Sequence, residues 1–210
     1  MNKRDFILSN FVIDDFIEKV NGNVILEETE SSGKSKLDIK LPNEKQFLCI
    51  KNVDSGQKTD IAFFKKDKDL SLKKRVDHII FEEVKDNQWN AHLIEMRTSV
   101  GVKTWTDIKG KFRASYLMVQ GIAAMLDMQL AHIYMYTTYE TEFLSAGTMP
   151  VERRVRTGGI PPKKEWDSGK VQLNFGEILR VDHEKIQMSR QGNELVGTAC
   201  LGKGNYRVRN

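Results

Sequence analysis

Short runs of apolar residues, alternating or continuous, recur along the first half of the chain and predict β-strands. Side chains alternate between the two faces of a strand, so a strand with one buried face has an apolar residue at every second position. Runs of this kind occupy residues 36–41, 46–51, 60–64, 76–81 and 89–97. The polar residues 85–88 between the last two runs predict a tight turn, so we expect an antiparallel hairpin there.

A helical pattern follows this hairpin after a short linker at residues 98–103. The residues that repeat at intervals of three and four are Trp105, Ile108, Phe112, Ser115, Val119, Ile122 and Leu126. This spacing predicts a helix over about residues 104–127, with Lys109, Arg113 and Gln120 on its other face. Residues 130–139 are rich in aromatic and β-branched side chains and predict another strand. A helix between two strands indicates a parallel crossover packed on the sheet.

The two ends of the chain give weaker patterns. Residues 11–20 have helical spacing and stop at Asn21-Gly22, whereas the polar residues 27–36 predict a loop. Residues 147–164 are irregular and basic, and short strand-like runs follow at 171–175 and 195–201. We therefore expect an α/β core over residues 1–142, with a mixed central sheet flanked by helices, and a basic loop with a β-rich C-terminal extension over residues 143–210.

Composition narrows the class of protein only slightly. The 210 residues are 40% hydrophobic and 30% charged, with a formal net charge of +4, which permits a polyanionic partner without requiring one. No stretch approaches the roughly 18 consecutive apolar residues of a membrane span, and the N-terminus lacks the apolar core of a signal peptide. The two cysteines, Cys49 and Cys200, show no metal-ligand spacing. We expect free thiols in a cytoplasmic protein.

Charged residues interrupt the two strands of the expected hairpin. Asp77 lies in the apolar run 76–81, and Glu95 and Arg97 close the run 89–97. A carboxylate in an apolar strand needs a partner, a metal ion or a proton. Two carboxylates and a cation at neighbouring strand ends are the components of a divalent-metal phosphodiesterase site. An ordinary salt bridge at the rim of a sheet explains the same residues, and the sequence leaves both interpretations open.

The order of predicted elements up to residue 139, together with Asp77 and Glu95, resembles the core of the PD-(D/E)XK, or restriction-endonuclease-like, nuclease superfamily. In that family the aspartate and the glutamate bind one or two divalent metal ions. The resemblance therefore implies Mg²⁺ or Mn²⁺ held by Asp77 and Glu95, and hydrolysis of phosphodiester bonds in DNA or RNA. It also implies a bacterial or phage setting, in host-phage defence or mobile-element biology.

The chain departs from the family pattern two residues after Glu95. The family carries a lysine there that helps to position or activate the attacking water, whereas this chain carries Arg97. Arginine stays protonated, so it holds a phosphate but does not accept a proton. Some family members carry the lysine on the following helix, which makes Lys109 the candidate, with Lys103 as the second choice and Arg113 one turn further on.

Two further metal ligands follow from the same resemblance. The backbone carbonyl of Met96 would complete the ligand set at the strand ends. Glu18, on the predicted first helix, corresponds to a helix glutamate that binds metal in some relatives. A solvated helix carboxylate beside Lys19 is the simpler interpretation of Glu18.

Basic residues outside the core are candidates for contacts with a nucleic-acid backbone. In the irregular segment they are Arg153, Arg154, Arg156, Lys163 and Lys164, accompanied by two glycines. A second basic cluster, over residues 65–75, directly precedes the Asp77 strand. Positive charge and accessible backbone amides suit a phosphate clamp, and a solvated surface is the alternative in both places.

Two functions of different classes stay open. The first is a metal-dependent nuclease, and the second is a non-catalytic regulator of similar fold that binds nucleic acid or protein. An open, metal-sized gap between the carboxylates of Asp77 and Glu95 favours the enzyme, Arg97 filling that gap favours the binding protein, and a large separation excludes both. The sequence does not decide between DNA and RNA, nor between a monomer, a homodimer and a larger complex.

Overall fold

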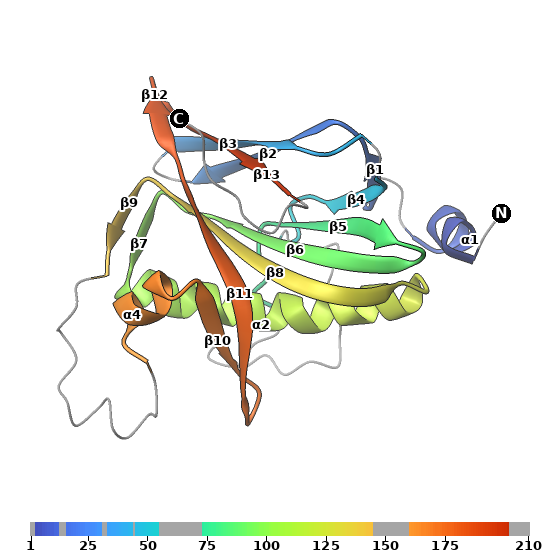
Figure 1. The fold of residues 1–210 in the computed structure, drawn as a ribbon. Coiled ribbons are helices and arrows are strands. Elements are labelled where there is room, and N and C mark those ends of the chain that lie inside the picture. Colours follow the sequence, from blue (N-terminus) through green and yellow to red (C-terminus); the bar gives the residue numbers. More distant parts are fainter. Residues whose placement is uncertain are drawn as a thin grey trace.

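Two β-sheets and one long helix form three layers in the computed structural model, which describes residues 3–12, 16–30, 33–43, 45–54, 73–144 and 160–201. The fold is mixed α/β and consists mostly of strands (Figure 1). Its helices within these residues are α1 (Lys3–Asn10), α2 (Val102–Met125) and α4 (Pro162–Asp167). None of the described helices combines the length and apolar composition needed to cross a membrane.

The central sheet has seven strands in the described part of the chain, in the order β1-β4-β5-β6-β8-β11-β10. These are β1 (Glu18–Val20), β4 (Phe47–Ile50), β5 (His78–Lys85), β6 (Gln88–Met96), β8 (Gln129–Tyr139), β11 (Ile178–Gln187) and β10 (Lys170–Asn174). Strands β6 and β8 run parallel, as do β8 and β11, and the other neighbours run antiparallel. The sheet is therefore mixed.

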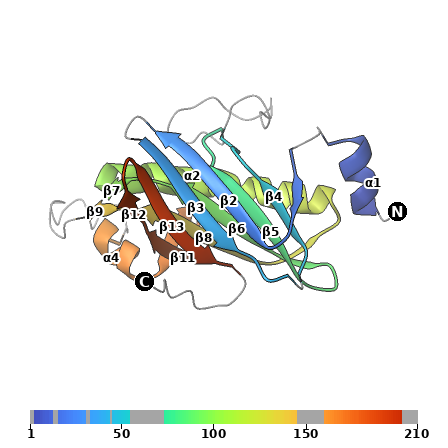
Figure 2. The ribbon, with the colours of Figure 1, turned by 90° about the horizontal axis from the view of Figure 1, so that it is seen from above.

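A second sheet lies across one face of the central sheet (Figure 2). Its order among the described residues is β12-β13-β3-β2, formed by β12 (Ser189–Gln191), β13 (Glu194–Cys200), β3 (Gly33–Lys40) and β2 (Asn23–Glu30). Strands β13 and β3 pair in parallel, so the C-terminal region completes a sheet begun near the N-terminus. Two short strands, β7 (Ser99–Gly101) and β9 (Thr141–Phe143), form a separate parallel pair.

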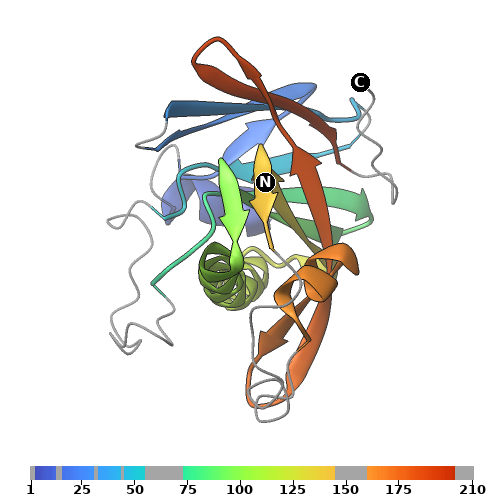
Figure 3. The same cartoon turned by 90° about the vertical axis from the view of Figure 1, so that its left-hand side faces the viewer.

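Each face of the central sheet is covered by one of the other layers (Figure 3). Helix α2 packs on one face, where the core includes Trp105, Ile108 and Phe112. The second sheet packs on the other face, where the core includes Leu26 and Ile39. Strands β5 and β6 are consequently buried on both sides, which explains their nearly continuous apolar sequences.

The expected hairpin and crossover are both present. Strands β5 and β6 pair antiparallel through a turn in which Asp86 and Asn87 have φ angles of 28° and 63°. Positive φ at both central residues is typical of the hairpin turns that match strand twist, and Asp and Asn tolerate this conformation. Helix α2 then connects β6 to the parallel strand β8, as its apolar spacing predicts.

The N-terminal region differs from the sequence expectation. The described part of residues 11–20, which excludes 13–15, does not form the predicted helix: α1 ends at Asn10, and residues 18–20 form β1. The loop predicted over residues 27–36 belongs to β2 and β3, which pair antiparallel. Polar residues occupy this pair because one of its faces meets solvent, while Leu26 and Leu37 point into the core. The strand predicted at residues 60–64 lies outside the described residues.

The C-terminal strands join both large sheets. Residues 170–187 supply β10 and β11 to the central sheet, and residues 189–200 supply β12 and β13 to the second sheet. The sequence did not predict β11 because its buried residues change face along the strand. Val181 packs on the α2 side, whereas Ile186 packs between the two sheets.

Candidate functional site

Asp77 and Glu95 face each other at adjacent ends of β5 and β6. The antiparallel register pairs His78 with Ile94, so Asp77 and Glu95 follow as the next opposed positions on the two chains. Opposed residues of an antiparallel pair place their side chains on the same face. Both are buried, at 2% and 0% exposure. The backbone N–H of Met96 donates to Oδ2 of Asp77 at 2.6 Å and so fixes the orientation of that carboxylate.

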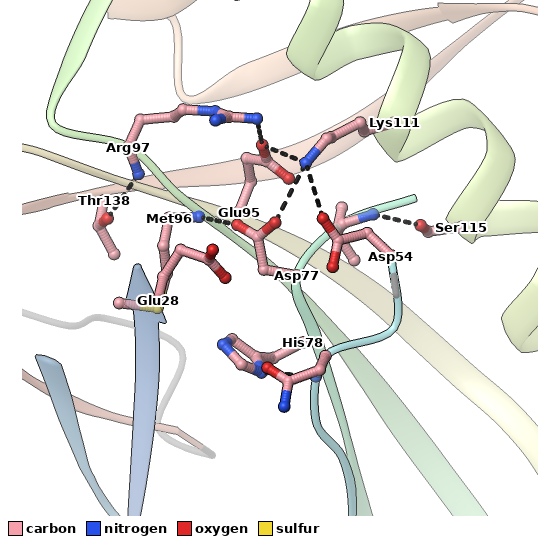
Figure 4. A network of polar contacts seen from close by, with 12 residues as sticks. Glu28, Asp54, Asp77, His78, Glu95, Met96, Arg97, Lys111, Ser115 and Thr138 are labelled. Atoms are coloured by element: carbon pink, nitrogen blue, oxygen red, sulfur yellow. Dashed lines mark hydrogen bonds and ion pairs between the residues drawn. The ribbon is translucent and has the colours of Figure 1, made fainter. Parts of the chain in front are cut away.

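Lys111 of α2 occupies the point at which the two carboxylates converge (Figure 4). Its Nζ lies 3.1 Å from Oδ1 of Asp77 and 2.9 Å from Oε1 of Glu95. Asp54, which follows β4, approaches the same Nζ at 3.8 Å. The lysine side chain is itself largely buried, so this is an ion cluster inside the protein and not a surface salt bridge.

Arg97 contacts Glu95 from another direction. Its Nη2 lies 2.5 Å from Oε1 of Glu95, and its backbone N–H donates to Oγ1 of Thr138 on β8 at 3.1 Å. The guanidinium is partly exposed, whereas Glu95 is fully buried. The guanidinium of Arg97 therefore stands between the buried carboxylate and solvent.

The position of Lys111 is set by the way α2 packs on the strand that carries Asp77. Ser115 interrupts the apolar face of the helix, and its Oγ accepts the backbone N–H of Val76 at 3.0 Å. Lys111 lies one turn earlier on the same side of the helix, since residues four apart are neighbours on a helix surface. The hydrogen bond of Ser115 thus fixes α2 at the height at which Lys111 reaches the carboxylates.

The charges at this site perturb one another strongly. Burial raises the pKa of Glu95 to about 8, and the nearby charge of Asp77 adds to the increase, while Lys111 and Arg97 oppose it. Burial lowers the pKa of Lys111, but attraction to Glu95 and Asp77 outweighs burial, so the net pKa of the lysine is raised. The two carboxylates therefore stabilise the protonated form of the lysine.

The structure brings together only some of the residues that the sequence suggested. Asp77, Glu95 and Arg97 meet as expected. Lys109 lies elsewhere: its Nζ contacts Oε2 of Glu165 at 2.9 Å, and that carboxylate also accepts the indole N–H of Trp105. Lys111 takes the position expected for Lys109.

The remaining candidates lie away from the two carboxylates or outside the described residues. Lys103 is exposed at the start of α2 and Arg113 is half-buried further along it. Glu18 lies on β1, where it pairs with Lys51 at 3.0 Å. Lys163 pairs with Glu142 and Asp167, and Lys164 is exposed on α4. Arg153, Arg154 and Arg156 lie outside the described residues.

The sequence did not predict that Lys111, Asp54 and Glu28 belong to this site. Glu28 projects from β2 toward Asp77 in Figure 4, so the second sheet also contributes to the site. Ser115, one turn after Lys111, was the available sign that this side of the helix meets the Asp77 strand. The sign for Glu28 was the inward alternation of Val24 and Leu26, which places Glu28 on the buried side of the same strand.

The donor atoms at this site fit a divalent cation. Carboxylate oxygens are the preferred ligands of Mg²⁺ and Mn²⁺, and Asp77 and Glu95 direct theirs at one point. Oε2 of Glu95 is buried and has no hydrogen-bond partner among the described residues, as expected of an oxygen suited to a further ligand. The described residues contain no group of three His, Cys, Asp or Glu that could hold a metal ion. Because the Lys111 Nζ contacts both carboxylates, a cation bound by the two would take its place.

No protein-family model, curated protein or solved structure matches this chain.

Proposed function

We propose that the chain is a metal-dependent phosphodiesterase that cleaves DNA or RNA, with a core of restriction-endonuclease type. One observation carries the proposal: the Lys111 ammonium contacts both Asp77 and Glu95, which neighbouring strands present to the same point. Two carboxylates and a lysine from the following helix are the components that the family resemblance implies. The order hairpin, helix α2 and parallel strand β8 supports the same proposal.

Each residue of the site would have its own role in such a reaction. Asp77 and Glu95 would hold the cation through their carboxylate oxygens, and the Met96 N–H keeps Asp77 oriented. When bound, a divalent cation lowers the pKa of a coordinated water and neutralises charge on the phosphate. Lys111, freed from the carboxylates, and Arg97 would hold the non-bridging phosphate oxygens and stabilise the charge that develops in the transition state.

A non-catalytic nucleic-acid-binding protein is the second candidate, and Arg97 favours it. The guanidinium contacts Glu95 at 2.5 Å, and Lys111 contacts both carboxylates, so the chain partly neutralises the site without any metal ion. Such a protein would use Arg97 as a phosphate contact and would bind its partner equally well in EDTA. Lys103 and Arg113 would extend the contact to the nucleic-acid backbone in either function.

A cleavage assay on labelled single- and double-stranded DNA and RNA tests the proposal. We expect cutting in Mg²⁺ or Mn²⁺ and none in EDTA, with a loss of at least about 100-fold in Asp77→Asn and Glu95→Gln. Cutting that survives EDTA or both substitutions contradicts the proposed site. Salt-sensitive binding without cutting establishes the binding protein instead.

A further inference from the structure

Glu28 is a carboxylate that follows two apolar residues, Val24 and Leu26, on the inner side of strand β2. Strand β2 directs Val24 and Leu26 into the core between the two sheets, while Ile25 and Glu27 face solvent. Glu28 continues the inward row and is half-buried. Removing a carboxylate from water at such a position costs free energy. The groups around Glu28 should therefore explain why a carboxylate is found there.

The surroundings of Glu28 are those of the candidate site. Its carboxylate lies beside Asp77 and the Met96 segment, on the side away from α2 (Figure 4). Burial raises the pKa of Glu28, and repulsion by Asp77 and Asp54 raises it further, against a smaller opposing effect of Lys111. Oε1 accepts the backbone N–H of Thr29 at 3.2 Å. Within the described part of the chain, no cation forms an ion pair with Glu28.

Phosphodiester hydrolysis needs a group that accepts a proton from the attacking water, and the other residues of the site are poorly suited to that role. Arg97 does not deprotonate, and the proposed reaction already uses Arg97 and Lys111 to hold the phosphate oxygens. Asp77 and Glu95 are the proposed cation ligands. Nδ1 of His78 already accepts the backbone N–H of Asn52 at 3.3 Å, so this ring nitrogen is occupied.

We propose that Glu28 is the general base of the reaction, accepting the proton of the attacking water at the mouth of the site; this inference rests on the proposed function. The water oxygen forms the new bond to phosphorus as its proton passes to the carboxylate of Glu28. The bond between phosphorus and the bridging oxygen breaks. The bridging oxygen leaves with the electron pair and takes a proton from solvent, and Glu28 later returns its proton to solvent.

The test compares Glu28→Gln, Glu28→Asp and Glu28→Ala with Glu27→Gln, a matched control that faces solvent on the same strand. We expect Glu28→Gln to lower kcat roughly 100-fold, as the loss of a general base does, with no change in the Mg²⁺ concentration for half-maximal rate. Glu28→Asp should retain part of the rate. Formate should partly restore Glu28→Ala, because a small carboxylate can enter the space and accept the proton. Glu27→Gln should cleave at the wild-type rate.

Each contrary outcome has a separate meaning. Unchanged kcat in folded Glu28→Gln, or no rescue of Glu28→Ala by formate, overturns the general base while metal-dependent cutting by wild type preserves the proposed function. A rise in the Mg²⁺ requirement of Glu28→Gln also overturns it, because that result identifies Glu28 as a metal ligand. Absence of cutting by wild type overturns the proposed function and this inference together.

Discussion

Replacing Lys111 by methionine removes a side chain that contacts both buried carboxylates. Asp77 and Glu95 are almost fully buried, so the negative charge that they share loses a partner that solvent does not replace. Breaking a buried ion pair in this way costs about 3–5 kcal/mol. Arg97 still contacts Glu95, and the Met96 N–H still binds Asp77. We therefore expect a loss near the lower limit, about 3 kcal/mol of the free energy of unfolding.

Urea denaturation in EDTA measures this loss, with Lys109→Met as the matched control. Lys109 contacts Glu165, but that carboxylate keeps the Trp105 and Gln172 N–H donors, so the control should lose only about 1 kcal/mol. Adding Asp77→Asn to Lys111→Met should recover part of the loss, because it removes one of the repelling charges.

The effect of Mg²⁺ on the free energy of unfolding provides a second measurement on the same variants. A cation that occupies the position of the lysine should stabilise Lys111→Met by about 1.4 kcal/mol at a concentration tenfold above its dissociation constant, and Asp77→Asn should abolish this gain. A loss below about 0.5 kcal/mol in Lys111→Met would instead show that the contacts of the lysine contribute nothing measurable to stability.

Two further predictions concern stability. Burial lowers the pKa of His183 to about 3. Below about pH 6.5 the unfolded chain therefore binds a proton that the folded chain does not, so the free energy of unfolding decreases as the pH is lowered. Replacing His183 by Phe should reduce the slope of unfolding free energy between pH 6 and 4 by about 1.4 kcal/mol per pH unit, and an unchanged slope in acid titrations refutes this. A Cβ at Gly197 would clash with Sδ of Met188, so Gly197→Ala should cost about 1–3 kcal/mol in urea melts. The cost should shrink in a Met188→Ala background, and an equal cost in both backgrounds excludes the clash as its cause.

The central hairpin and its two carboxylates were predictable because local rules determine them. The turn after β5 sets the register, and alternation then places Asp77 and Glu95 on one face. Both residues are also charged residues within apolar strands. This identifies them as candidate site residues even when the elements packed against those strands are not known.

The choice of lysine was not predictable from the periodicity of α2. Both Lys109 and Lys111 flank the apolar stripe of the helix, and the stripe alone does not say which flank meets β5. Tertiary packing makes the choice: the Ser115 hydroxyl bonds Val76, and Glu165 of α4 takes Lys109 on the other flank. Because α2 and α4 lie far apart in the sequence, local sequence patterns do not indicate the contact between Lys109 and Glu165.

The second sheet was not predictable for a different reason. Polar residues dominate residues 27–36, although β2 and β3 are strands with one solvated face. Strand β13 completes their buried face by pairing in parallel with β3. It lies more than 150 positions later in the chain than β3. The contribution of Glu28 to the site depends on that assembly.

The most direct test of the account is the initial rate of cleavage, at saturating Mg²⁺, by wild type, Lys111→Met and Lys109→Met in parallel. If Lys111 acts with Asp77 and Glu95 at one phosphodiesterase site, its substitution should lower the rate at least about 100-fold while Lys109→Met retains most of it. Equal rates in the two variants would contradict the assignment of the site to this cluster of side chains.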